Sequence, residues 1–235
     1  MDALATIRAE LRAAADPADA EVLRRYFKTG PGEYGEGDRF LGVRVPAVRR
    51  LARAHDELSL EECAELLRSE IHEERLLALH LLVRRHQRGS AAQREAVYRL
   101  YLASTAHVNH WDLVDTSAAD IVGAHLAQGN RAPLLALARS ASVWERRIAI
   151  IATFHFIRHG ELEPTLRIAE MLLGDGHDLI HKAVGWMLRE VGKRDPASAE
   201  AFLRAHCRAM PRTMLRYAIE KLPEPLRQQY LRGEV

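Results

Sequence analysis

The chain contains little cysteine and no long apolar runs, and each of these features excludes a class of protein. Its 235 residues include only two cysteines, Cys63 and Cys207, which lie far apart and within helical patterns. We expect both to be reduced thiols, which excludes a secreted disulfide scaffold and favours a cytoplasmic protein. No stretch is long and apolar enough for a transmembrane helix, and the segment from Met1 to Arg8 shows no apolar signal core. We therefore expect a soluble protein with no membrane partner.

Lysine is also scarce, because only four of the 34 basic residues are lysine and the other 30 are arginine. Arginine suits bidentate contacts to phosphate, although a GC-rich genome produces the same bias. The formal net charge of +2 is compatible with a nucleic-acid partner without demonstrating one. The hydrophobic content of 48% suffices for one elongated domain or two small ones.

Several common catalytic and metal-binding motifs are missing. His72 precedes two glutamates but lacks the second histidine of a zinc-protease helix. The pairs His107/His110 and His177/His181 have helical metal spacing, yet no third ligand accompanies either pair. There is no Gly-x-Ser-x-Gly elbow, and neither cysteine has an activating partner. We expect no metal and no cofactor.

The 3.6-residue apolar pattern runs through nearly every segment, and no alternating strand pattern competes with it. Asp16 followed by proline, Pro46, and the capping box of Ser59 and Glu62 are helix start signals. They predict helices near 17–28, 45–55 and 60–69. Later helices are expected to begin at Pro133, Pro164, Pro196 and Pro211.

The predicted helices come in pairs with a regular period. The second helices begin near His72, Asn109, Val143, Asp178 and Arg212, roughly 34–37 residues apart. Such a period is typical of a helical solenoid, and Glu74–Ala78 resembles Glu145–Ala149 two repeats later. Tetratricopeptide and ankyrin signatures are absent. The sequence predicts an all-α fold, a HEAT-like helical-repeat solenoid with a concave binding face; an irregular helical bundle is the alternative.

A glycine-rich stretch, Thr29–Asp38, interrupts the helical pattern. No Gly-Lys-Ser/Thr follows it and no strand precedes it, so it is not a phosphate loop. It is either a plain connection or a loop that touches nucleic acid or shields a site. We expect one domain over 1–235, with N-terminal helices at about 1–28, this connection at 29–38, and repeats at about 40–232.

Trp111 and Asp115 stand one helical turn apart, about 40° apart on the edge of an apolar stripe. An edge position borders the core and still faces a groove. Asn109 is a plausible N-cap, which places Asp115 in the second turn, beyond reach of the first amides. The alternative is that Asp115 pairs with an arginine of the next repeat and that Trp111 fills the core.

Arg147 follows Trp111 by 36 residues, and Trp186 follows Arg147 by 39. Because equivalent helices of a solenoid line one face, these residues can converge with Asp115. One carboxylate, one guanidinium and two indoles suit a cationic group on a phosphate-bearing polymer. The alternatives are an interhelical salt bridge for Arg147 and core filling for Trp186, beside Gly185 where helices pack closely.

The chain resembles the AlkD family of alkylpurine DNA glycosylases, which are built from HEAT-like repeats. The resemblance runs through nearly the whole chain. Its segments are Arg25–Lys28, Phe40–Arg49, Trp111–Asp115, Trp144–Arg147 and Ala183–Glu190.

The resemblance implies hydrolysis of the N-glycosidic bond of cationic N3- or N7-alkylated purines in duplex DNA, in bacterial base excision repair. Because no closed dimer interface is evident in the sequence, we expect a monomer. Asp115 would be the catalytic carboxylate. Trp111 and Trp186 would contact the lesion nucleotide, and Arg147 would hold the backbone. Further DNA contacts are expected from Tyr26, Lys182 and Arg189. The family also implies recognition without an enclosing base pocket.

Two departures from the family pattern stand out. His110 replaces a second tryptophan expected just before Trp111, and the Thr29–Asp38 stretch is longer than usual. Two other functions therefore stay open: a weakly catalytic relative that binds damaged or unusual DNA, and a protein-binding scaffold.

Overall fold

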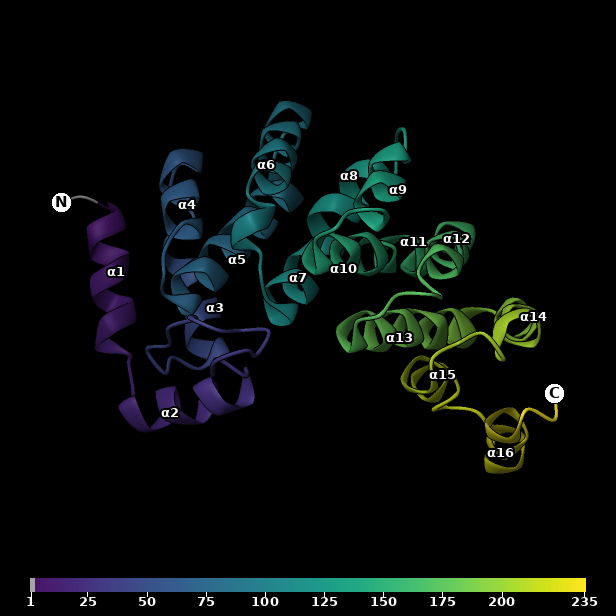
Figure 1. Ribbon diagram of the computed structural model, residues 1–235. Helices are drawn as coiled ribbons and strands as arrows, with labels where there is room; N and C mark the ends of the chain where they lie inside the picture. The colour runs from purple at the N-terminus through teal and green to yellow at the C-terminus, as the bar shows by residue number, and fades with distance from the viewer. Residues whose placement is uncertain (1–2) are drawn as a thin grey trace. The chain divides into compact units, whose positions relative to one another are not determined.

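The structure, a computed structural model, describes residues 3–235 and is built from α-helices (Figure 1). Within these residues the pairing of extended backbone is limited to one isolated bridge between Arg39 and Ile71. Contacts divide the chain into two units, Met1–Ile121 and Val122–Val235. The all-α helical-repeat fold is confirmed, whereas a single domain, the HEAT class and a concave face stay predictions.

The first unit is arranged around one long helix, α5 (His72–Arg88), most of whose residues are buried. Helices α3, α4, α6 and α7 all pack against α5, and Figure 1 shows α4 beside it. Residues 1 and 2 of the predicted N-terminal helices lie outside the described residues. The other helices are α1 (Ala3–Ala13), α2 (Pro17–Tyr26), α3 (Val45–Ala54), α4 (Leu60–Leu67), α6 (Ala91–Ala103) and α7 (Trp111–Ala118), with a 3₁₀ turn at Thr105–His107.

The predicted start signals of this unit act as caps. The Asp16 carboxylate accepts hydrogen bonds from the first amides of α2, and Ser59 and Glu62 form the complete capping box of α4. The prediction that Asn109 caps α7 is wrong, because the N-cap is His110. The His110 backbone is extended, and its ring bonds elsewhere instead of capping the helix. Asp115 still lies in the second turn.

The second unit is arranged around α13 (Asp178–Arg194), which packs against α10, α12, α14 and α15. A π-helical turn at Ala119–Gly123 leads into α8. The other helices are α8 (Ala124–Leu126), α9 (Ala132–Ala138), α10 (Val143–Ala152), α11 (Phe154–Arg158), α12 (Glu163–Met171), α14 (Pro196–His206), α15 (Arg212–Ala218) and α16 (Glu224–Arg232).

Helix starts in this unit also follow the sequence. Pro133, Pro164 and Pro196 occupy the first turns of α9, α12 and α14, and Pro211 directly precedes α15. A Cβ at Gly185 would lie 2.5 Å from the Met214 carbonyl oxygen. The close helix packing expected beside Gly185 is therefore confirmed, because only glycine lets α15 approach α13 this closely.

Four of the five predicted second helices begin where expected, at His72, Val143, Asp178 and Arg212, and the fifth begins at Trp111.

Both cysteines are buried and free, as predicted. Burial raises the pKa of Cys63 to about 11, so it is a poor nucleophile at neutral pH. None of the helices in residues 3–235 has the length and apolar character needed to cross a bilayer.

Candidate functional site

A stack of four rings fixes Trp111 at the start of α7. The Trp111 ring stacks on Phe27, with centroids 5.2 Å apart and planes 25° apart. Phe27 stacks on Phe40 at 5.1 Å, and Phe40 stacks on His72 at 4.5 Å. His72 is buried while Trp111 is half-buried. The stack therefore connects Trp111 to the buried rings of Phe27 and His72 and holds the indole in one orientation.

Tyr26 is the exposed aromatic beside this stack. It is 63% exposed, at the last position of α2. Its ring meets Trp111 edge-on, with centroids 6.0 Å apart and planes 72° apart. Tyr26 and Trp111 together form an aromatic corner with one solvent-exposed member, as expected for a residue that faces a partner.

Beneath the corner, His72 bridges two carboxylates. Its Nδ1 lies 2.7 Å from Asp38 Oδ2, and its Nε2 lies 2.8 Å from Asp112 Oδ2. Carboxylates only accept hydrogen bonds, so both ring nitrogens donate and His72 is an imidazolium. Burial alone would lower the pKa of His72, but Asp112 and Asp38 raise it to about 9. The interaction with His72 in turn holds the pKa of Asp112 far below its usual range, against the effect of burial.

This ion network ties three segments together. Asp38, at the end of the glycine-rich stretch, also accepts a 2.6 Å hydrogen bond from Arg75 of α5. Arg75 donates in addition to the Ser69 carbonyl oxygen at 2.9 Å. Asp112 lies in the first turn of α7, next to Trp111. The network thus fixes the start of α7 against α5 and the glycine-rich stretch.

His110 and the glycine-rich stretch contact each other. His110 is fully buried, with Nδ1 2.9 Å from Asp112 Oδ1 and Nε2 3.2 Å from the Phe27 carbonyl oxygen. Tyr34 of the glycine-rich stretch packs on its ring at 5.4 Å. A Cβ at Gly35 would lie 2.6 Å from the Phe27 carbonyl oxygen and 3.4 Å from His110 Nε2. The glycine-rich stretch therefore closes over His110 and requires a glycine there.

Asp115 is half-buried, one turn after Trp111. Burial, followed by the charge of Asp115, raises the pKa of Tyr101, which places the carboxylate near that buried phenol. The Tyr101 hydroxyl pairs with Ser117 Oγ at 3.0 Å, and Ser117 donates to the Leu113 carbonyl oxygen at 2.6 Å. Asp115 accordingly borders the core at the edge of the apolar stripe, as the helical pattern predicts.

In the second unit, Arg147 and Trp186 are held by specific contacts. Arg147 is only 5% exposed, and its Nη1 donates to the Leu179 carbonyl oxygen of α13 at 2.5 Å. Trp186 is half-buried, donates from Nε1 to Glu190 Oε1 at 3.1 Å, and packs near Phe154. Both side chains therefore join elements of this unit, whatever else they contact.

The two expected cations of α13 are ion-paired. Lys182 is 41% exposed and lies 2.7 Å from Asp178 one turn earlier. Arg189 pairs with Glu220 and is 18% exposed. The convergence of Trp111, Asp115 and Tyr26 of the first unit with the residues of the second stays a prediction, as do their roles.

The sequence does not predict that three members of the ion network, Asp38, His72 and Asp112, lie together. They lie 34 and 40 positions apart, and no local motif connects such distances. Their one local clue is that Asp112 follows Trp111 directly. Within residues 3–235, no three His, Cys, Asp or Glu side chains are grouped as metal ligands.

Comparisons with known proteins agree with this architecture. No curated protein sequence matches the chain. A solved structure described as a predicted DNA alkylation repair enzyme from Enterococcus faecalis superposes with a TM-score of 0.68. It is 18% identical, and the match covers 89% of this chain and 97% of that one, which supports the fold. A family model described as DNA alkylation repair enzyme matches residues 7–222. The chain therefore belongs to the DNA alkylation repair enzyme family.

Proposed function

We propose that this chain is an AlkD-type DNA glycosylase that releases cationic N3- and N7-alkylated purines from duplex DNA. The observation that carries the proposal is the placement of Trp111 and Asp115. Both are half-buried one turn apart on α7, beside the exposed ring of Tyr26. An indole, a phenol ring and a carboxylate at one surface suit a positively charged nucleotide.

A single carboxylate is chemically sufficient for such substrates. Ordinary glycoside hydrolysis uses two carboxyl groups, one of which protonates the leaving group. A purine alkylated at N3 or N7 already carries a positive charge and leaves as a neutral base, so it needs no proton from the enzyme. Asp115 then stabilises the positive charge that builds on the deoxyribose and positions a water molecule for attack.

The aromatic residues supply binding rather than proton transfer. A cation over an indole face gains about 0.5–2 kcal/mol. Trp111 is preorganised for this role, because the stack on Phe27 fixes its ring before any ligand arrives. Trp186 is the second indole of the proposal. In our proposal the lesion is read through its charge, sugar and backbone, without an enclosing base pocket.

The cations of the second unit would bind phosphate. Arg147 would hold the backbone near the lesion, because a guanidinium can form charge-assisted, bidentate contacts to phosphate. Lys182 and Arg189 would exchange their partners Asp178 and Glu220 for phosphate oxygens. Such contacts fix register and read no sequence, so binding would be general to duplex DNA.

The proposed mechanism is tested by comparing the release of cationic bases with the release of uncharged bases. Purified protein is incubated with duplexes that carry 7-methylguanine, 3-methyladenine, or the uncharged lesions uracil and hypoxanthine, and free base is quantified. We expect release of the two cationic bases only. Equal release of uncharged bases would require a general acid and would refute the one-carboxylate mechanism.

A second candidate is a relative that binds damaged or unusual DNA without efficient catalysis. The contact of Tyr34 and Gly35 with His110 favours it, because the residue at the family's tryptophan position is buried under the glycine-rich stretch. It predicts tight binding to damaged duplexes with no base release. The same incubation, followed by a gel-shift assay, separates the two candidates.

A further inference from the structure

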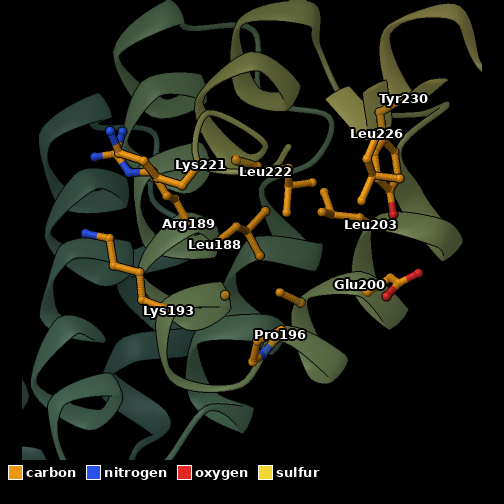
Figure 2. A pocket seen from close by; sticks show the side chains of 13 residues that line it. Leu188, Arg189, Lys193, Pro196, Glu200, Leu203, Lys221, Leu222, Leu226 and Tyr230 are labelled. Carbon is orange, nitrogen blue, oxygen red and sulfur yellow. The ribbon is translucent and has the colours of Figure 1, made fainter. Parts of the chain in front are cut away.

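The second unit contains an apolar cavity of about 240 Å³ between α13, α14, α15 and α16. Leucine side chains form most of its wall, from Leu188, Leu203, Leu222 and Leu226 (Figure 2). The cavity is therefore large enough for a small organic molecule and too apolar for a purely charged one.

The Tyr230 hydroxyl is a buried polar group at this cavity without a hydrogen-bond partner in the described part of the chain. Tyr230 is 2% exposed and lines the cavity, and its hydroxyl has no hydrogen-bond partner within the described residues. Figure 2 shows the phenol oxygen on the side of Leu203. Burial raises the pKa of the Tyr230 phenol, so it keeps its proton at neutral pH and can donate. A buried hydroxyl left unpaired destabilises the fold, and an acceptor on a ligand would remove this cost.

The other end of the cavity is cationic. Arg189, Lys193 and Lys221 line it, and Figure 2 shows their nitrogens gathered on the side away from Tyr230. Two carboxylates, Glu190 and Glu220, pair with these three cations. One positive charge is left in excess, which favours an anionic group at this end.

The Tyr230 end has the opposite preference. Glu200 lines the cavity on this side and pairs with Arg204. The charges of both act on the Tyr230 phenol, and the effect of Glu200 is the larger, which disfavours a second anionic group here. A neutral oxygen, such as a hydroxyl, accepts from Tyr230 without this penalty.

We propose that this cavity is a binding site for a small, elongated carboxylate with an apolar body and a neutral hydroxyl at its far end. The carboxylate lies at Arg189, Lys193 and Lys221, the body packs on the leucines, and the hydroxyl accepts a hydrogen bond from Tyr230. The site lies wholly in the second unit. It shares Arg189 with the proposed DNA contacts, but binding of a small carboxylate does not require glycosylase activity.

Three probes of the same length distinguish the contribution of the carboxylate from that of the hydroxyl. Their binding is measured by isothermal titration calorimetry on the full chain without DNA. They are 8-hydroxyoctanoate, octanoate, which lacks the hydroxyl, and 1,8-octanediol, which lacks the charge. We expect 8-hydroxyoctanoate to bind at least about fivefold more tightly than either of the others, the size expected for one buried hydrogen bond or one desolvated charge contact. No saturable binding of 8-hydroxyoctanoate at about millimolar concentration would overturn the proposal.

Two variants test which end of the cavity binds the hydroxyl and which end binds the carboxylate. Tyr230→Phe removes only the unpartnered hydroxyl, so the thermal midpoint should not fall and the preference for 8-hydroxyoctanoate over octanoate should disappear. Its control is Tyr217→Phe on α15, outside the cavity. Lys193→Gln should weaken both carboxylates and leave the diol unchanged, with Arg194→Gln as its control. A hydroxyl preference that survives in Tyr230→Phe would overturn the assignment.

Discussion

The ring of Tyr34 lies against the ring of His110, with centroids 5.4 Å apart. The two residues belong to the two features that the sequence resemblance marks as departures, the long glycine-rich stretch and the histidine at an expected tryptophan position. Because His110 also bonds to Asp112, next to Trp111, the stretch is connected to the proposed site. We infer that the two departures form one structural adaptation rather than two independent changes.

Substitution at Gly35 tests this connection. Gly35→Ala places a Cβ 2.6 Å from the Phe27 carbonyl oxygen, and backbone must shift to accept it. We expect a loss of about 1–3 kcal/mol in the free energy of unfolding, the usual cost of overpacking. Urea unfolding measures it, and Gly129→Ala is the control because a Cβ there meets nothing within 4 Å. Equal stability of both variants would show that the stretch does not close over His110.

Removal of the His72 cation tests the ion network. His72→Gln leaves Asp38 and Asp112 buried without the charge that lies between them. Breaking a buried ion pair from one side costs about 3–5 kcal/mol, and we expect a loss in this range by chemical denaturation. His159→Gln, at an exposed histidine, should stay within about 0.5 kcal/mol of the parent protein. A loss below about 1 kcal/mol in His72→Gln would contradict a buried imidazolium.

The pH dependence of stability follows from the same histidine. The pKa of His72 is raised from an ordinary 6.5 to about 9 in the folded protein. The stabilisation is thus complete below pH 6.5 and is lost as pH rises through about 9; the maximum is about 3 kcal/mol. The free energy of unfolding of the parent protein should fall between pH 7 and pH 10 more steeply than that of His72→Gln. Parallel pH profiles of the two proteins would exclude a raised pKa at His72.

The salt dependence of DNA binding tests the second unit. Lys182→Gln removes one proposed phosphate contact, so the slope of log K against log salt should become shallower by about one. Affinity should fall alike for all duplex sequences, which fluorescence anisotropy measures at several salt concentrations. Lys221→Gln removes the same charge from a residue outside the proposed DNA contacts. A loss confined to one sequence would refute a phosphate role for Lys182.

The sequence predicts those parts of the fold that depend on local interactions. Helix starts at Pro17, Leu60 and Pro196 are specified by caps and prolines within three residues. The local sequence is therefore enough to predict them. The edge placement of Trp111 and Asp115 follows from helical periodicity alone. The structure confirms both, with Trp111 and Asp115 half-buried on α7.

What the sequence did not predict depends on distant contacts. Residue preference predicts Asn109 as the cap of α7, whereas His110 takes the position because its ring bonds to Asp112 and to the Phe27 carbonyl oxygen. The pairing of His72 with Asp38 likewise joins residues 34 positions apart. Such contacts form only when helices pack, and no local sequence pattern predicts them.

Base release by the Asp115→Asn variant tests the central claim most directly. Single-turnover release of 7-methylguanine from a defined duplex is measured for the parent protein, Asp115→Asn and the neighbouring control Asp120→Asn, with DNA affinity determined in parallel. We expect Asp115→Asn to lose release by at least about a hundredfold, as expected for lost transition-state charge stabilisation, while it binds DNA normally and Asp120→Asn keeps its rate. An unchanged release rate in Asp115→Asn would contradict the proposed mechanism.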